Sequence, residues 1–265
     1  MGHVHYHVQD VEANKRFWVA MGGKPAPKLG ATEVIKFPDL LILLDQGPSS
    51  GGNTGSVVGH VAFSVPDLPQ ALTKWEAAGI KVIRNTASTA VRADLVMPNG
   101  NGDTVEVFGE MLPNAFFFAQ WMLPADPDDF SSQRFIRKMT TPLMFHHVHF
   151  YLPKGAGMDV QGQEWYVKTF AAKPGVRWMY KAADLPGINL DFSGDAVPPG
   201  APTKGRVLDH IGFEVKNLEA FCKKLQAQGV KFDVPYTKNS NGIASAMFTD
   251  PWGVSVELTE GLNKL

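Results

Sequence analysis

Four segments of this chain begin alike, and this internal repeat restricts the possible folds more than any other feature. Each segment starts with a histidine that is followed by β-branched and aromatic residues, a composition typical of a short strand. The four segments are His3–Val8, His60–Val65, His147–Leu152 and His210–Val215. We therefore expect four copies of one supersecondary unit.

The residues after each opening strand predict a helix. Asp10, Asp67 and Asn217 lie seven residues past the histidine of their repeats, and such side chains accept a free backbone N–H of a first helical turn. Lys154 occupies this place in the third repeat, so its helix should begin later, near Asp159. Gly79 and Gly229 should end the helices predicted over 68–78 and 218–228.

Further strands follow each helix, and the last strand of the second and fourth repeats carries a glutamate. Glu106 lies 46 residues after His60, and Glu257 lies 47 residues after His210. Both glutamates stand in the middle of an apolar strand. A carboxylate there costs free energy unless it is paired or coordinates a metal ion.

The repeats themselves form pairs. The first resembles the third, because both begin His-Val-His, and the second resembles the fourth. We interpret this as the duplication of a pair of modules, with adjacent modules forming each pair. The expected organisation is an N-terminal pair over 1–110 (modules 1–56 and 57–110), a connector over 111–143, and a C-terminal pair over 144–265 (modules 144–200 and 206–265).

The connector belongs to neither half. Four prolines interrupt the stretch between residues 110 and 143, and Phe116 and Trp121 make it too apolar for a free linker. We expect it to pack between the halves. The alternative is that it lines a substrate opening or a dimer contact, which would make the protein a homodimer.

All eight histidines lie on the opening strands. A lone strand histidine usually has only a structural role, but eight confined to equivalent positions favour a metal site, since neutral imidazole is the commonest metal ligand. They are His3, His5, His7, His60, His146, His147, His149 and His210.

Strand alternation indicates which histidines could act together, because side chains two residues apart share a face. Pairing of adjacent modules would place His147 beside His210, and His3 beside His60. The expected ligand sets are therefore His147, His210 and Glu257 in the C-terminal half, and His3, His60 and Glu106 in the N-terminal half. Two histidines and a carboxylate with open positions suit Fe(II), Mn(II), Zn(II) or Ni(II).

Asp191 is a further candidate ligand. Aligning residues 187–192 with 253–258 puts Asp191 opposite Glu257, whereas the matching place in the first module, near Ile42, is apolar. The C-terminal half could then offer four protein ligands and the N-terminal half three.

These motifs resemble the vicinal oxygen chelate superfamily, the group of glyoxalases, bleomycin resistance proteins and extradiol dioxygenases. The resemblance rests on the opening histidines followed by Asp or Asn, on the turn Asp250–Gly253, and on Glu257 between Val and Leu. It implies an α+β fold of four βαβββ modules in two pseudo-symmetric pairs, each pair forming a curved sheet around a metal and substrate cup. Members bind the metal through opening-strand histidines and last-strand glutamates and chelate a substrate through two adjacent oxygens.

The resemblance suggests three kinds of function. A four-ligand set is similar to glyoxalase I and related lyases and isomerases, in which Glu257 would be both ligand and base, and His149 or His5 would transfer a proton. The alternatives are an Fe(II) extradiol-type dioxygenase and a non-catalytic protein that sequesters its ligand, as bleomycin resistance proteins do. The dioxygenase pattern places a tyrosine where this chain has Met247, and a histidine is missing from 237–246.

Composition excludes several classes of partner. The formal net charge of −1 and a pI near 6.7 argue against nucleic acid and anionic membranes as main partners. The longest apolar stretches are too short to cross a bilayer, so a small molecule is the expected partner. The single Cys222 excludes an internal disulfide framework.

The sequence shows no secretory leader, which favours the cytoplasm. An exported form stays an alternative, because the first predicted strand begins so close to Met1 that natural residues before it could have been lost.

Overall fold

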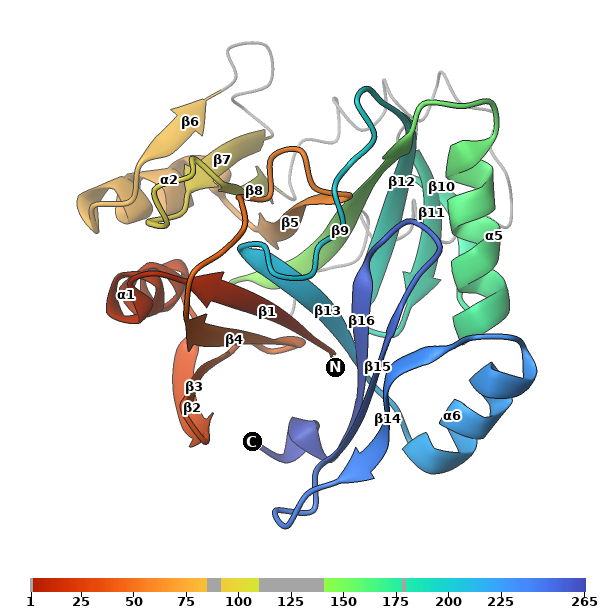
Figure 1. The fold of residues 1–265 in the computed structure, drawn as a ribbon. Helices are drawn as coiled ribbons and strands as arrows, with labels where there is room; N and C mark the ends of the chain where they lie inside the picture. The colour runs from red at the N-terminus through yellow and green to blue at the C-terminus, as the bar shows by residue number, and fades with distance from the viewer. Residues whose placement is uncertain (1, 85–91, 110–140, 178–179) are drawn as a thin grey trace.

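The computed structural model describes residues 2–84, 92–109, 141–177 and 180–265, and these form four βαβββ modules in chain order (Figure 1). The fold class expected from the repeats is confirmed. The expected packing of Phe116 and Trp121 between the halves falls outside the described residues. Within the described part of the chain, no helix combines the length and the apolar composition that a bilayer crossing requires.

The four modules have the same order of elements. Module 1 consists of β1 (Gly2–Val8), α1 (Val11–Met21), β2 (Lys24–Leu29), β3 (Thr32–Lys36) and β4 (Leu40–Gln46). Module 2 consists of β5 (Val58–Val65), α2 (Leu68–Ala77), β6 (Val82–Arg84), β7 (Arg92–Val96) and β8 (Thr104–Gly109). Module 3 consists of β9 (Met144–Pro153), α5 (Met158–Phe170), β10 (Lys173–Arg177), β11 (Tyr180–Leu185) and β12 (Ile188–Ala196). Module 4 consists of β13 (Leu208–Glu214), α6 (Leu218–Ala227), β14 (Phe232–Lys238), β15 (Ala244–Thr249) and β16 (Ser255–Glu260), and a short 3₁₀ helix, η1 (Leu262–Lys264), follows it.

The strands form two eight-stranded sheets, and each sheet joins a module of one half to a module of the other. The 1/4 sheet has the order β14-β15-β16-β13-β1-β4-β3-β2, and the 2/3 sheet has the order β10-β11-β12-β9-β5-β8-β7-β6. Both sheets are curved (Figure 1). We call the histidine-bearing faces of these sheets the 1/4 cup and the 2/3 cup.

The expectation that adjacent modules share a sheet is therefore wrong. Opening strands do meet at the centre of each sheet, but β1 runs antiparallel to β13 and β5 antiparallel to β9. All four opening strands have the same apolar alternation, so this pattern does not specify which of them pair with each other. Within each half, one segment joins the two modules and so crosses from one sheet to the other. These two crossing segments contact each other: Ser56 forms a β-bridge with Ala201, and the Arg206 side chain donates to Gly52 O at 2.9 Å.

The core lies on the opposite face of the sheets from most of the histidines. In β1 the even-numbered residues Val4, Tyr6 and Val8 are buried in the main hydrophobic cluster. Helices pack there against the other sheet: the ring of Trp18 in α1 lies 6.1 Å from that of Phe63 in β5. The odd-numbered histidines of β1 consequently face the 1/4 cup.

The predicted helices are confirmed, including the late start of the third, where α5 begins at Met158. Asp10 accepts from Ala13 N at 2.8 Å, and Asp67 accepts from Gln70 N at 2.9 Å, so both cap their helices as expected.

Asn217 does not cap α6. Its backbone is left-handed, with φ of 55°, and its side chain makes no capping bond. The carboxylate of Glu260 in β16 accepts from the N–H groups of Asn217 and Leu218 instead, at 3.1 and 3.0 Å. A side chain from a distant strand thus replaces the local cap.

Candidate metal centres

The 1/4 cup brings together His3, His210 and Glu257, which come from β1, β13 and β16. Gly212 lies between two of them, because it is opposite His3 on one side and opposite Glu257 on the other. His210 precedes Gly212 by two residues and so shares its face.

Gly212 leaves the space in which the His3 ring lies. A Cβ atom at position 212 would stand 1.9 Å from His3 Cε1 and 2.2 Å from His3 Nδ1. The missing side chain lets the imidazole of β1 extend across β13 and approach Glu257 on the far side.

Three donor atoms converge as a result. His3 Nε2 lies 2.9 Å from Glu257 Oε2, and His210 Nε2 lies 3.3 Å from the same oxygen. Donors that bind one ion at about 2.0–2.2 Å are themselves separated by about 2.9–3.5 Å. Both nitrogens are buried and, among the described residues, have no hydrogen-bond partner. The donor set therefore fits a divalent metal ion.

Asp209 fixes the orientation of the His210 ring. Its Oδ1 atom lies 2.6 Å from His210 Nδ1, the carboxylate–histidine arrangement that commonly orients metal-binding imidazoles. Burial alone would lower the pKa of His210, but the carboxylates of Asp209 and Glu257 outweigh it and raise the pKa to about 9. Burial would likewise raise the pKa of Glu257, whereas His210 and His3 hold it below its usual value.

The 2/3 cup repeats this geometry with His60, His147 and Glu106. Ala62 occupies the place of Gly212, between His147 and Glu106 in the register. Glu106 Oε2 lies 3.3 Å from His60 Nε2 and 3.5 Å from His147 Nε2, and the two nitrogens are 3.3 Å apart. These distances also suit one ion.

Arginines distinguish the carboxylates of the 2/3 cup from Glu257. Arg92 Nε lies 2.6 Å from Glu106 Oε1, and Arg177 makes an ion pair with Asp191. Burial would raise the pKa of Glu106, but His60 and Arg92 hold it below its usual value. Burial raises the pKa of Asp191 to about 6 in spite of the guanidinium.

The remaining histidines are divided between the two cups. His149 is buried, lies 2.7 Å from Ser193 Oγ, and belongs to the 2/3 cup; burial holds its pKa well below the usual value. It is therefore not beside Glu257, with which the sequence had associated it in catalysis. His5 belongs to the 1/4 cup with Glu257, since its ring centroid lies 4.5 Å from that of His210.

The expected ligand sets are corrected by the crossed pairing of modules. His147 does not lie beside His210, and His3 does not lie beside His60. The observed sets are His3, His210 and Glu257 in the 1/4 cup, and His60, His147 and Glu106 in the 2/3 cup.

The position of Asp191 is corrected with them. It lies 4.0 Å from His147 Nε2 in the 2/3 cup, not with Glu257. Its register partner is His149, and the corresponding position of module 1, opposite His5, is Leu43. The first donor set of the 1/4 cup therefore has three side chains, whereas the 2/3 cup has a fourth potential donor nearby, the carboxylate of Asp191.

Sequence reasoning did not identify Gly212, Asp209, Arg92 or Arg177 as parts of these sites. A signal was present for Asp209, which directly precedes a predicted ligand. The arginine partners and the role of Gly212 follow from strand register, which the sequence pattern does not specify.

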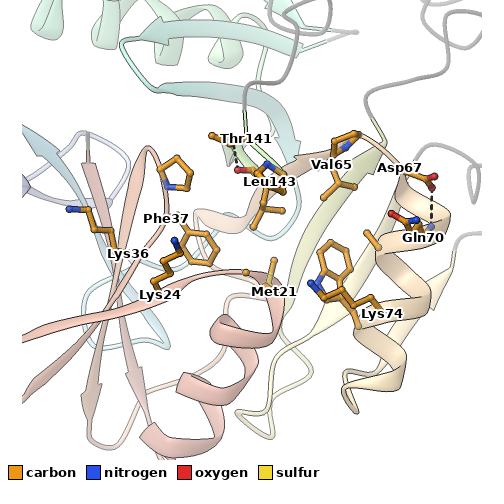
Figure 2. Close-up of a pocket in the computed structure, with 16 residues that line it drawn as sticks. Met21, Lys24, Lys36, Phe37, Val65, Asp67, Gln70, Lys74, Thr141 and Leu143 are labelled. Atoms are coloured by element: carbon orange, nitrogen blue, oxygen red, sulfur yellow. Dashed lines mark hydrogen bonds between the residues drawn. The ribbon is translucent and has the colours of Figure 1, made fainter.

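A pocket of about 650 Å³ lies away from both cups (Figure 2). Met21 of α1, Trp75 of α2 and Leu143 contribute apolar surface, and Lys24 and Lys74 lie at its edge. It contains none of the histidines of the candidate metal centres, so it is not the substrate site expected from the sequence.

Comparisons with known proteins agree with this fold. Residues 136–258, which include module 3 and most of module 4, match the family model described as Glyoxalase/Bleomycin resistance protein/Dioxygenase superfamily. No curated protein matches the sequence.

Two solved structures illustrate the likeness of fold. Glyoxalase I from Zea mays is 15% identical, with a TM-score of 0.67 over 97% of this chain and 91% of that one. A candidate dioxygenase from Bacillus subtilis subsp. subtilis str. 168 is 12% identical, with a TM-score of 0.63 over 98% of this chain and 84% of that one. The family match is limited to residues 136–258, whereas the likeness to these solved structures shows that the fold of tandem βαβββ modules is shared over nearly the whole chain.

Proposed function

We propose that the protein is a divalent-metal-dependent enzyme that acts on a small oxygenated metabolite, with lyase or isomerase chemistry of the glyoxalase kind. The observation that carries the proposal is the pair of buried imidazole nitrogens, His3 Nε2 and His210 Nε2, which approach one Glu257 oxygen and lack hydrogen-bond partners among the described residues. Two imidazole nitrogens and one carboxylate oxygen at these separations can all bind a single divalent ion.

We assign the reaction to the 1/4 cup rather than the 2/3 cup. Among the described residues Glu257 makes ion pairs only with two imidazoles, whereas Glu106 and Asp191 are each held by an arginine. An arginine partner occupies carboxylate oxygens that an ion would otherwise contact, so Glu257 is the better candidate for a metal ligand that also accepts a proton from the substrate.

Each residue of the 1/4 cup would have a distinct role in this reaction. His3, His210 and Glu257 hold the ion, which polarises a substrate oxygen when bound. Asp209 keeps His210 Nε2 directed at the ion through its contact with Nδ1. Glu257 removes a proton, and His5, which shares a hydrogen bond of 3.0 Å with Asp45, is placed to carry that proton onward.

An Fe(II) dioxygenase is the second candidate. The three-donor set of the 1/4 cup, with Leu43 at the fourth place, favours it, because two histidines and one carboxylate with open positions suit non-haem iron. Met247 counts against it: this residue lies directly opposite Glu257 on β15 and has no ionisable group. Ring cleavage would lack the tyrosine that the resemblance implies at this position.

Metal content tests the proposal. We expect Glu257→Gln and His3→Ala each to remove one equivalent of bound transition metal, and the double variant to remove no more, because both residues hold the same ion. Glu76→Gln is the matched control, because Glu76 lies on helix α2 and pairs with Arg84 on the surface. Elemental analysis after purification without added metal provides the measurement.

The outcome also separates the kinds of function. A protein that carries no transition metal and takes up none on titration would exclude both enzymes in favour of a sequestering protein. Nickel or zinc with turnover of methylglyoxal and glutathione supports the glyoxalase-like reaction. Iron with oxygen consumption on catechols would replace it with the dioxygenase.

A further inference from the structure

We propose that the 1/4 cup has a second cation site, formed by His5, His7 and Asp45, next to the site of His3, His210 and Glu257. One potential ligand atom from each of these three residues lies within 4.8 Å of the other two. The site goes beyond the proposed function, since its occupancy does not require that the first ion be catalytic.

Strand register explains why the three side chains meet. His3, His5 and His7 alternate along β1 and so share the cup face. In the parallel pairing of β1 with β4, Asp45 is the partner of His7. Its carboxylate reaches back to His5, whose Nε2 lies 3.0 Å from Asp45 Oδ2.

The surroundings favour a cation. Asp45 Oδ1 accepts from Thr32 Oγ1 at 2.5 Å, which turns Oδ2 toward His5. Asp209 adds a second carboxylate, with its Oδ2 at 3.7 Å from His7 Nδ1.

The second group is open to solvent, in contrast to His3. The side chains of His7 and Asp45 are 31% and 35% exposed. Asp45 also lines a pocket of about 800 Å³, together with Thr32 and Gln46 among others. An ion would therefore have an entry path, which a functional metal site needs.

Among the described residues, the 2/3 cup has no counterpart of this group at the matching strand positions. Tyr151 and Ser193 are register partners there, as His7 and Asp45 are in the 1/4 cup, and His149 corresponds to His5. His149 bonds to Ser193 Oγ rather than to a carboxylate. The two cups thus share the first donor set but not the second.

Two adjacent cations would change which substrates the 1/4 cup accepts. The rings of His5 and His210, one from each donor group, have centroids 4.5 Å apart. Positive charge on both sides of this contact would favour a substrate that carries a negative charge as well as an oxygen for the first ion.

Metal stoichiometry tests the second site. Zn²⁺ or Mn²⁺ is titrated into metal-stripped full-length protein, and the bound equivalents are counted by calorimetry and elemental analysis. We expect His7→Ala and Asp45→Asn each to lose one equivalent, and the two together to lose no more. Combining His7→Ala with Glu257→Gln should lose two equivalents, because these residues hold different ions.

The controls use the matching positions of the 2/3 cup. Tyr151→Phe and Ser193→Ala should leave the number of equivalents unchanged. Circular dichroism and thermal unfolding check the fold of each variant, and His7→Gln replaces His7→Ala if the latter is unfolded. Equal stoichiometry in wild-type protein, His7→Ala and Asp45→Asn would refute the second site. The metal content of Glu257→Gln tests only the proposed function, whereas that of His7→Ala and Asp45→Asn tests only the second site. Either proposal can therefore be refuted without the other.

Discussion

At the scale of single residues, Gly212 controls whether the 1/4 cup can form its donor set. The His3 ring occupies the volume where any other side chain at position 212 would lie. Ala62 shows that the equivalent place in the 2/3 cup tolerates a methyl group, with His147 and Glu106 as its register partners. The two cups therefore seat their histidines differently despite the same spacing of ligands.

Gly212→Ala is expected to remove the metal of the 1/4 cup without unfolding the protein. The added methyl group would meet a side-chain ring, which can rotate away from it, so the backbone of β13 need not move. The rotated ring would no longer point at Glu257. Metal analysis together with thermal unfolding measures this, and Ala62→Gly is the control. Retained metal in folded Gly212→Ala would show that His3 does not need this space.

At the scale of secondary-structure elements, α6 begins in an unusual way. Among the described helices, α1 and α2 start after an extended residue and α5 after a left-handed glycine, whereas the non-glycine Asn217 adopts a left-handed conformation before α6. The N–H groups at this end are satisfied by Glu260, which lies 42 residues away from Leu218 in the chain. The start of this helix thus depends on the strand β16, which also carries Glu257.

Glu260→Ala should lower the free energy of unfolding by about 1 kcal/mol, the usual cost of losing an N-cap. Asn217→Gly is the informative comparison, because glycine adopts a positive φ readily and the Asn217 side chain makes no capping bond. We expect its stability to stay close to that of the wild type. Urea denaturation measures both, and a larger loss for Asn217→Gly than for Glu260→Ala would contradict this account.

At the scale of the whole molecule, each sheet depends on both halves of the chain. His3 stands in the first module and its partners His210 and Glu257 in the last, so neither half contains all three donors of this candidate metal centre. The main hydrophobic cluster includes residues of all four modules. Folding and metal binding should therefore respond to the whole chain rather than to separate N- and C-terminal domains.

A disulfide between Val4→Cys and Ile211→Cys, in a Cys222→Ala background, should form when the protein is refolded under oxidising conditions. These residues are antiparallel partners at the centre of the 1/4 sheet, where opposed Cα atoms are about 4.5–5.5 Å apart, within disulfide range. Val4→Cys with Val61→Cys is the control, because adjacent-module pairing would cross-link that pair instead. Mass spectrometry of the linked peptides identifies which bond forms.

The sequence by itself determined the repeated unit, its helices and its ligand types. Local signals carry these features: the alternation of the opening strands, the caps Asp10 and Asp67, and glycines such as Gly79 and Gly229 that adopt positive φ after helices. The histidines and glutamates were identifiable because polar residues on buried strands need a partner.

Only the tertiary structure decided which ligands meet. Four opening strands with one alternation pattern can pair in more than one way, and the choice rests on long-range packing and on the crossing segments near Ser56 and Ala201. For the same reason, His149 lies in a different cup from Glu257, and Asp191 lies in the 2/3 cup beside His147. Strand register joins residues that are far apart in the chain, and no local pattern in a single sequence encodes that register.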